Sequence, residues 1–196
     1  MKTHILLFIA LAAALAFAGC GSKSSFTDPR DGQTYKTVKI GNQVWMAENL
    51  NYKTANSYCY EDKTANCQKY GRLYTWDAAM RACPEEWHLP SDLEWSVLFE
   101  AVGGKGVAGL KLKSTSGWDD DGNGMDKYGF SVLPAGFRDG DGSYINAGKA
   151  AYFRSSTGSS SRSAYGWNFN VVSERVSSIY YHKDDGHSVR CLRDSD

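Results

Sequence analysis

The acidic segment TSGWDDDGNGMD contains the residues best suited to bind a metal ion. Asp119, Asp121 and Asn123 alternate and a glycine stands sixth, as in the first half of a calcium-binding loop. Such a loop closes with a glutamate at its twelfth position, where this chain has Phe130. Asp126 would then have to complete the site with a different geometry. These four polar residues are our candidate calcium ligands, and the alternative is a turn-rich loop stabilised by its own side chains.

Aromatic residues in the second half of the chain offer a different chemistry, because a flat ring can stack on the face of a sugar. Two loops, residues 118–126 and 137–147, are the predicted binding region. The candidate ligand-binding residues are Trp118, Arg138, Tyr144 and Trp167. The alternative for each ring is burial in the core or in a sheet.

The chain offers no set of residues that matches a known catalytic arrangement. Beyond the N-terminal segment, its histidines are His88, His182 and His187, which do not have metal-ligand spacing, and no Gly-x-Ser-x-Gly segment is present. The formal net charge is +0, which removes the electrostatic case for nucleic-acid binding. We therefore predict a protein without enzymatic activity and without a nucleic-acid partner.

Residues 1–19 have the features of a bacterial lipoprotein signal peptide. A basic start precedes an apolar run from Ile5 to Phe17, which is too short to cross a bilayer as a helix. Small residues precede Cys20, as in a lipobox, where the signal is cut before a cysteine that carries a diacylglycerol. An ordinary secretory signal is the alternative. We predict a lipidated Cys20, a flexible tether over residues 20–27 and, because Gly21 is not aspartate, attachment to the outer membrane of a Gram-negative bacterium.

The remaining four cysteines indicate two disulfides. If the N-terminal cysteine is lipidated, an even number remains in an oxidising compartment, and three pairings are possible. Cys59 and Cys67 lie close together across a short polar segment, which favours a bond between them. That bond leaves Cys83 to pair with Cys191, closing most of the domain. Residues 28–196 are then predicted to form one domain.

Local patterns predict a hairpin followed by two helices. Residues 35–45 alternate apolar and polar side chains around a Gly-Asn turn. A first helix is expected from Thr75 to Pro84. A second helix starts at Ser91, where Glu94 completes a capping box.

The second helix and the strands after it define the predicted fold class. An apolar stripe that consists of Leu93, Val97, Leu98, Ala101 and Val102 should face the core. The candidate strands that follow are residues 130–133, 152–155, 167–172, 176–181 and 187–192. Two consecutive helices before a small, mostly antiparallel sheet with long loops give an α+β protein.

Two resemblances meet in the segment TWDAAMRACPEEWHLPSDLEW. The order Trp76, Ala79, Cys83, Glu94 resembles the first half of a C-type lectin-like domain, in which the helix cysteine pairs with one near the last strand. That resemblance implies a bond from Cys83 to Cys191. The segment LPSDLEW is also similar to the formylglycine-generating, sulfatase-modifying family, whose enzymes use cysteines in copper and oxygen chemistry.

A more extensive resemblance covers residues 28–194. The segments that carry it are DPRDGQTYKTVKIGNQVWMAENLNY, YGRLYTWDAAMRACPEEWHLPSDLEW, YGFSVLPAGFRDGDG and SVRCLRD. They look like the Fibrobacter succinogenes major paralogous domain, a family of exported domains. The resemblance implies a cell-surface protein of a fibre-degrading bacterium.

These observations favour a lipid-anchored surface domain with a C-type-lectin-like fold. It is expected to bind a glycan or a surface protein and to reach the membrane only through its N-terminal lipid. The alternatives are an enzyme of the formylglycine-generating type and a purely structural envelope lipoprotein.

Overall fold

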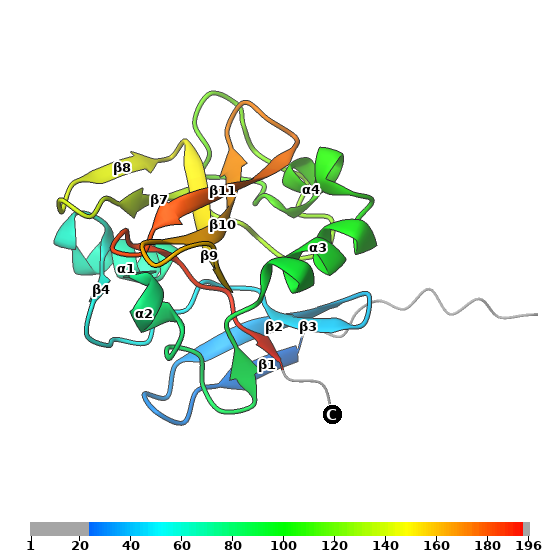
Figure 1. The fold of residues 1–196 in the computed structure, drawn as a ribbon. Coiled ribbons are helices and arrows are strands. Elements are labelled where there is room, and N and C mark those ends of the chain that lie inside the picture. Colours follow the sequence, from blue (N-terminus) through cyan, green and yellow to red (C-terminus); the bar gives the residue numbers. More distant parts are fainter. Residues whose placement is uncertain (1–23, 194–196) are drawn as a thin grey trace, which may run out of the picture.

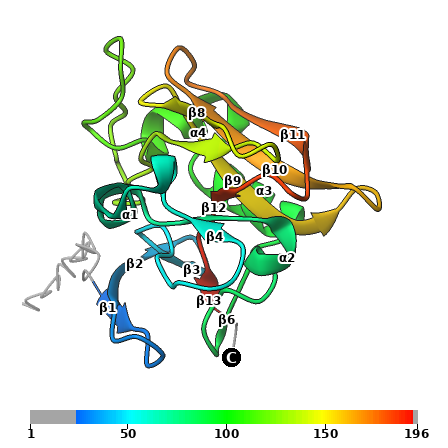
Figure 2. The same cartoon turned by 90° about the vertical axis from the view of Figure 1, so that its left-hand side faces the viewer.

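The computed structural model describes residues 24–193, so the predicted signal peptide and Cys20 lie outside the described residues. Two β-sheets, short helices and long connections make up this part of the chain (Figure 1). The sheet that begins with β1 occupies one end of the molecule, and the β7–β8 hairpin lies toward the other end (Figures 1 and 2). Within residues 24–193, no helix has the length and apolar character needed to cross a membrane.

The smaller sheet joins the N-terminal hairpin to the C-terminal part of the chain. Its strands are antiparallel, in the order β1–β2–β3–β13–β6. They span Ser24–Thr27 (β1), Thr34–Ile40 (β2), Gln43–Met46 (β3), Trp87–His88 (β6) and Leu192–Arg193 (β13). The predicted hairpin is confirmed, since Gly41 turns between β2 and β3 with a φ of 59° that suits glycine. Leu192 pairs with both Trp45 and His88, which places β13 inside this sheet.

The larger sheet follows the order β11–β10–β9–β12–β5–β4, with β7 pairing to β9 and to β8. Its strands span Ser57–Tyr58 (β4), Leu73–Tyr74 (β5), Ala135–Arg138 (β7), Tyr144–Ala147 (β8), Ala150–Gly158 (β9), Ser163–Asn170 (β10), Val176–His182 (β11) and His187–Ser188 (β12). Most pairs are antiparallel, but β9 pairs parallel with β12 and β7. The sheet is therefore mostly antiparallel, as predicted.

Two predicted strands are corrected. Residues 187–192 form two short strands in different sheets, because the chain crosses from the larger sheet to the smaller one between them. Residues 130–133 form no strand, and Ser131 there has a φ of 53°, which is incompatible with extended pairing.

The helices are shorter and more numerous than the sequence suggested. They span Tyr60–Asp62 (η1, a 3-10 turn), Thr64–Tyr70 (α1), Trp76–Ala79 (α2), Asp92–Ala101 (α3) and Lys105–Leu112 (α4). The first predicted helix is the single turn α2, and the side chain of Thr75 makes no capping hydrogen bond. The capping box of the second is confirmed, because Glu94 N donates to Ser91 Oγ and Ser91 N donates to a Glu94 carboxylate oxygen.

The buried face of α3 agrees only in part with the predicted stripe: Leu98 and Val102 are buried as predicted, at 0% and 1% exposure. Leu93 is 73% exposed and Val97 is 47% exposed, so neither belongs to the core. Trp95 and Phe99, four residues apart, occupy the inner face together with Leu98. This orientation removes two large aromatic rings from water, which is worth more than burying the two aliphatic side chains.

Aromatic rings fill the space between α3 and the sheets. The Trp95 ring lies 4.8 Å from the Trp45 ring and 5.4 Å from the Phe153 ring, centroid to centroid. Phe99 makes an edge contact with Trp167 at 4.7 Å. These contacts join β3, α3, β9 and β10 in one core.

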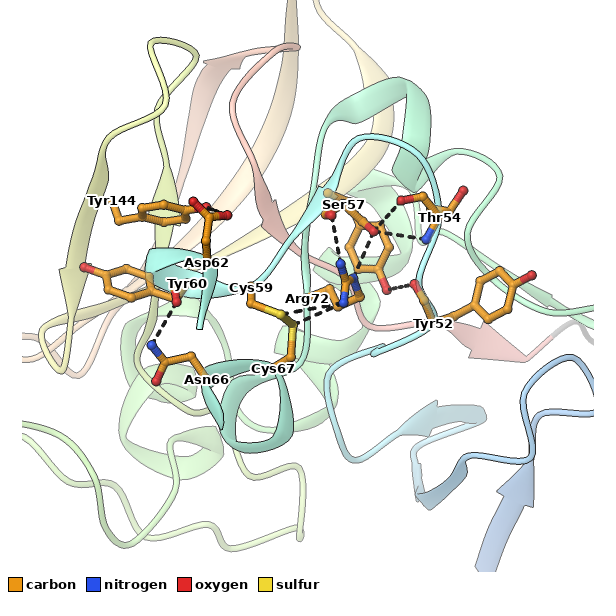
Figure 3. The surroundings of a disulfide bond; sticks show 11 residues. Tyr52, Thr54, Ser57, Cys59, Tyr60, Asp62, Asn66, Cys67, Arg72 and Tyr144 are labelled. Carbon is orange, nitrogen blue, oxygen red and sulfur yellow. Dashed lines mark hydrogen bonds between the residues drawn. A yellow bond between two sulfur atoms is a disulfide. The ribbon is translucent and has the colours of Figure 1, made fainter. Parts of the chain in front are cut away.

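Both predicted disulfides are confirmed. Cys83 and Cys191 are joined by an S–S bond of 2.07 Å, which links the segment after α2 to the segment before β13. Cys59 and Cys67 are joined at 2.03 Å and enclose η1 and the start of α1 (Figure 3). The longer bond joins two segments outside the helices and strands, whereas the shorter bond joins such a segment to α1.

Arg190 is fully buried and connects three separate segments. Its Nε donates to Asn49 Oδ1 at 2.7 Å, and its Nη2 donates to the carbonyl of Ser131 at 3.0 Å. Its Nη1 donates to the carbonyls of Phe130 and Met46. Desolvation lowers the pKa of the guanidinium to about 9, which reflects how completely the charge is removed from water.

Candidate functional site

Two of the four predicted ligand-binding residues are corrected by the structure, because both tryptophans are buried. Trp167 is 0% exposed and packs in the aromatic core. Trp118 is 5% exposed, and its Nε1 donates to Ser114 Oγ and to the carbonyl of Val132, both at 3.1 Å. Neither ring has a free face on which a sugar could stack, so both serve the fold.

The predicted calcium ligands do not form a common site. Asn123 Oδ1 accepts from the backbone N–H of Trp118 at 3.1 Å. The carboxylate of Asp126 accepts from both N and Oγ of Ser131. Within residues 24–193, no three or more Asp, Glu, His or Cys side chains are grouped so that they could hold a metal ion.

The other two candidate calcium ligands are Asp119 and Asp121. The carboxylate of Asp119 lies against Gly148, where an added Cβ would come within 2.6 Å of it. Asp121 is exposed and has a φ of 57°. The segment is therefore a turn-rich loop held by its own side chains, which was the alternative to the calcium site.

Arg138 and Tyr144, by contrast, lie together. They face each other across the β7–β8 hairpin, where they are partners in the strand register. The guanidinium carbon of Arg138 lies 4.0 Å from the centre of the Tyr58 ring and 6.0 Å from that of Tyr144. The Tyr144 ring also lies beside that of Tyr60, with centroids 5.2 Å apart (Figure 3). Three aromatic rings and one cation therefore gather at one place.

A carboxylate completes this group. Tyr144 Oη donates to Asp62 Oδ1 at 2.7 Å. Partial burial and this hydrogen bond raise the pKa of Tyr144 to about 12, so the phenol stays protonated and remains a donor. Asp62 is exposed, and the tyrosines and Arg138 are half-buried. We call this group the hairpin patch, which consists of Tyr58, Tyr60, Asp62, Arg138 and Tyr144.

The Cys59–Cys67 disulfide holds the first half of the patch. Glu61 and Asp62 have positive φ values of 53° and 55°, an unfavourable backbone conformation that the surrounding bonds must maintain. On the other side of the disulfide, Arg72 donates to the carbonyl of Ser57 and approaches both sulfurs (Figure 3). Sequence reasoning missed Tyr58, Tyr60 and Asp62, although their position in and beside a cystine-closed loop was a usable signal.

A buried arginine positions the second half of the patch, which is Arg138 and Tyr144 on the β7–β8 hairpin. Arg154 is 0% exposed, and its Nη2 donates to the carbonyls of His182, Lys183 and Asp185. It thereby fixes the turn after β11. That turn exchanges two backbone hydrogen bonds with Arg138 through Gly186, at 2.9 and 2.7 Å. The β7–β8 hairpin is therefore connected, through the turn that contains Gly186, to the buried guanidinium of Arg154.

His187 lies beside this arginine inside a group of aromatic rings. Its ring centre is 4.5 Å from that of Tyr181 and 5.7 Å from those of Phe137 and Tyr152. Neither ring nitrogen has a hydrogen-bond partner among the described residues. Desolvation, with a smaller effect from Arg154, lowers the pKa of His187 well below 6.5, so the imidazole is neutral in the folded protein.

This neutral histidine makes stability depend on pH in a defined direction. Below about pH 6.5, the unfolded chain protonates His187 and the folded chain does not, so the free energy of unfolding falls as the pH falls. Between about pH 7.5 and pH 5, we expect this group alone to lower it by about 2 kcal/mol. His187→Phe should remove that component in urea unfolding, whereas His182→Asn, at an exposed position, should retain it. An unchanged pH dependence in His187→Phe would mean that the folded protein protonates His187.

The side chains of the hairpin patch are of kinds that can contact a ligand. Ring faces, a guanidinium and a carboxylate can contact a polar ligand, while all four cysteines of residues 24–193 are joined in disulfides. A free thiol pair of the kind used by formylglycine-generating enzymes is therefore missing from the described residues.

Comparison with known proteins identifies a family. Residues 38–193 match the family model described as the Fibrobacter succinogenes major domain. No curated protein and no solved structure matches the chain.

Proposed function

We propose that this chain, which belongs to the Fibrobacter succinogenes major domain family, is a lipid-anchored, non-enzymatic domain that binds polysaccharide at the surface of a Gram-negative cell. The observation that carries the binding proposal is the hairpin patch. Sugars present a face of C–H groups to aromatic rings and hydroxyl groups to charged side chains. The patch offers both kinds of partner within one group of side chains.

The rigidity of the patch supports the same function. The Cys59–Cys67 bond holds Tyr58 and Tyr60, and two backbone bonds to Gly186 hold the hairpin. A binding surface that is already ordered loses less conformational entropy when the ligand binds. Weak individual sugar contacts can then add up to useful affinity.

We also infer that the fold is related to C-type lectin-like domains. Two features support this: the Cys83–Cys191 bond links the segment after α2 to the segment before β13, and α2 and α3 follow in the expected order. Cys20 supplies the proposed anchor, and Gly21 after it favours the outer membrane. The two disulfides suit such an oxidising location.

Binding to a panel of soluble glycans and to insoluble plant polysaccharides tests this function. Tyr144→Ala and Arg138→Ala should each weaken binding about tenfold or more, since each removes a contact worth about 1.4 kcal/mol. Tyr180→Ala is the matched control, because Tyr180 is 61% exposed on β11 and lies outside the patch. A loss confined to Tyr180→Ala would place the ligand on β11, and no binding to any glycan would leave a protein partner.

A further inference from the structure

A groove of about 1180 Å³ lies between the β2–β3 hairpin, the end of α1 and residues 126–133. It is separate from the hairpin patch, none of whose residues line it. β1, β2 and α1 lie on the same side of the molecule in Figure 2. Arg190 forms part of the groove wall, already bonded to the backbone.

Positive charge is concentrated along this groove. Its exposed cationic side chains are Lys36, Lys39, Lys69, Lys127 and Arg193. Within residues 24–193, no carboxylate forms an ion pair with Lys39, Lys69 or Lys127. The chain as a whole has a formal net charge of +0, so the groove is a local excess and not a general property.

Two carboxylates, Glu48 and Asp126, also line the groove, and Glu48 lies 3.6 Å from the Lys36 ammonium, so its charge is offset by Lys36 and not by the three unpaired lysines. Glu48 accepts from the backbone N–H of Lys36 at 2.7 Å. Asp126 accepts from the backbone N–H of Ser131 at 2.7 Å. Lysines that have no carboxylate partner attract groups that carry several negative charges, such as phosphates.

The groove lies where the chain leaves toward its proposed anchor. Ser24, the first residue of β1, lines it. Ser24 is the fourth residue after Cys20, so a fully extended connection spans at most about 14 Å. That reach keeps the groove within about two Debye lengths of the anchor at physiological salt. The β7–β8 hairpin lies toward the opposite end of the molecule in both views (Figures 1 and 2).

We propose that this groove binds the phosphate groups of anionic lipids in the membrane that holds the anchor. Contacts from Lys39, Lys69 and Lys127 orient the domain with its β1 end toward the bilayer. The hairpin patch then faces away from the membrane, toward polymers outside it. The inference rests on the proposed lipidation of Cys20.

The test uses the mature lipidated chain in nanodiscs, either of phosphatidylcholine alone or of phosphatidylcholine mixed with phosphatidylglycerol. Limited acetylation followed by mass spectrometry reports how accessible each lysine is. Lys39, Lys69 and Lys127 should react several-fold more slowly in the anionic discs, and added salt should restore their reactivity. Lys149, which is exposed between β8 and β9, should react equally in both discs.

A charge-reversed variant separates phosphate binding from shielding by the tether. Lys69→Glu combined with Lys127→Glu should abolish the protection of Lys39 in anionic discs. Lys149→Glu, which adds a negative charge at the hairpin end, should leave that protection intact. Circular dichroism of each variant should match that of the unmodified protein, because these three lysines are exposed.

Three results would overturn the proposal, and they differ from one another. Equal reactivity of the groove lysines in neutral and anionic discs would exclude phosphate binding, while the anchor would stand. Protection by an acidic polysaccharide such as polygalacturonate, and not by anionic lipid, would assign the groove to a polymer. A mass showing no diacylglycerol on Cys20 would remove the anchor itself, and with it the orientation.

Discussion

Removing the Cys83–Cys191 disulfide is expected to destabilise the protein more than any other single covalent change in the described residues. The bond joins residues that are 108 positions apart. In the chain-entropy model, cross-linking a loop of that length stabilises the folded state by about 4–5 kcal/mol. Domains are typically stable by only about 5–15 kcal/mol, so its loss removes a large part of the total.

The second disulfide provides the matched comparison. Cys59 and Cys67 are 8 positions apart, for which the same model gives about 2.5 kcal/mol. Urea unfolding of Cys83→Ala with Cys191→Ala should therefore show a loss about 2 kcal/mol greater than Cys59→Ala with Cys67→Ala. Equal losses would mean that loop closure does not govern the effect, and that Cys59–Cys67 stabilises the molecule mainly through its local contacts.

The same comparison separates stability from binding. The Cys59–Cys67 loop carries Tyr60 and Asp62 of the hairpin patch, while Cys83 and Cys191 pack in a core that contains no patch residue. Loss of the shorter bond should therefore impair ligand binding more than its modest effect on stability would suggest. In this molecule, the bond that matters more for folding is not the one that orders the candidate site.

Features encoded by neighbouring residues could be predicted from the sequence. The capping box of Ser91 and Glu94 and the Gly41 turn each depend on residues within one turn of the chain. Cys59 and Cys67 were paired on the same principle of closeness. Such features need no knowledge of what packs against them.

Helix α4 shows why the remainder could not be predicted. Its sequence KGVAGLKL contains two glycines, each of which disfavours a helix by about 1 kcal/mol. Gly109 is nevertheless required there, because an added Cβ would come within 2.5 Å of the carbonyl oxygen of Glu174. Leu110 N donates to that same carbonyl, so the contact also orders the helix. A segment that is distant in sequence therefore determines that these residues form a helix.

Only two residues of the hairpin patch could be predicted, because its other residues come from a segment far away in sequence. Arg138 and Tyr144 lie within one loop that could be recognised as a whole, but Tyr58 and Asp62 join them from a region far away in sequence. The buried polar residues beneath the site could not be predicted from the sequence either. Arg154 and His187 have side chains that usually lie at the surface or are only partly buried, yet both are 0% exposed.

Arg190→Met should be the most damaging substitution of a single polar side chain. Methionine fills much of the same volume but leaves Asn49 Oδ1 and the carbonyls of Phe130 and Ser131 without their donor. Each buried acceptor left without a partner costs about 1–3 kcal/mol, so we expect a total loss of about 3–5 kcal/mol in urea unfolding.

Arg193→Met is the matched control, because Arg193 is exposed and its ion pair with Glu86 is 3.7 Å long at the surface. That change should lower the free energy of unfolding by less than about 1 kcal/mol. Arg190→Lys should remain strongly destabilised, since one ammonium group cannot replace donors that point in three directions. If Arg190→Met instead lost less than about 1 kcal/mol, relief of the buried charge would offset the broken bonds. Arg190 would then determine how the three segments are arranged without adding to their stability.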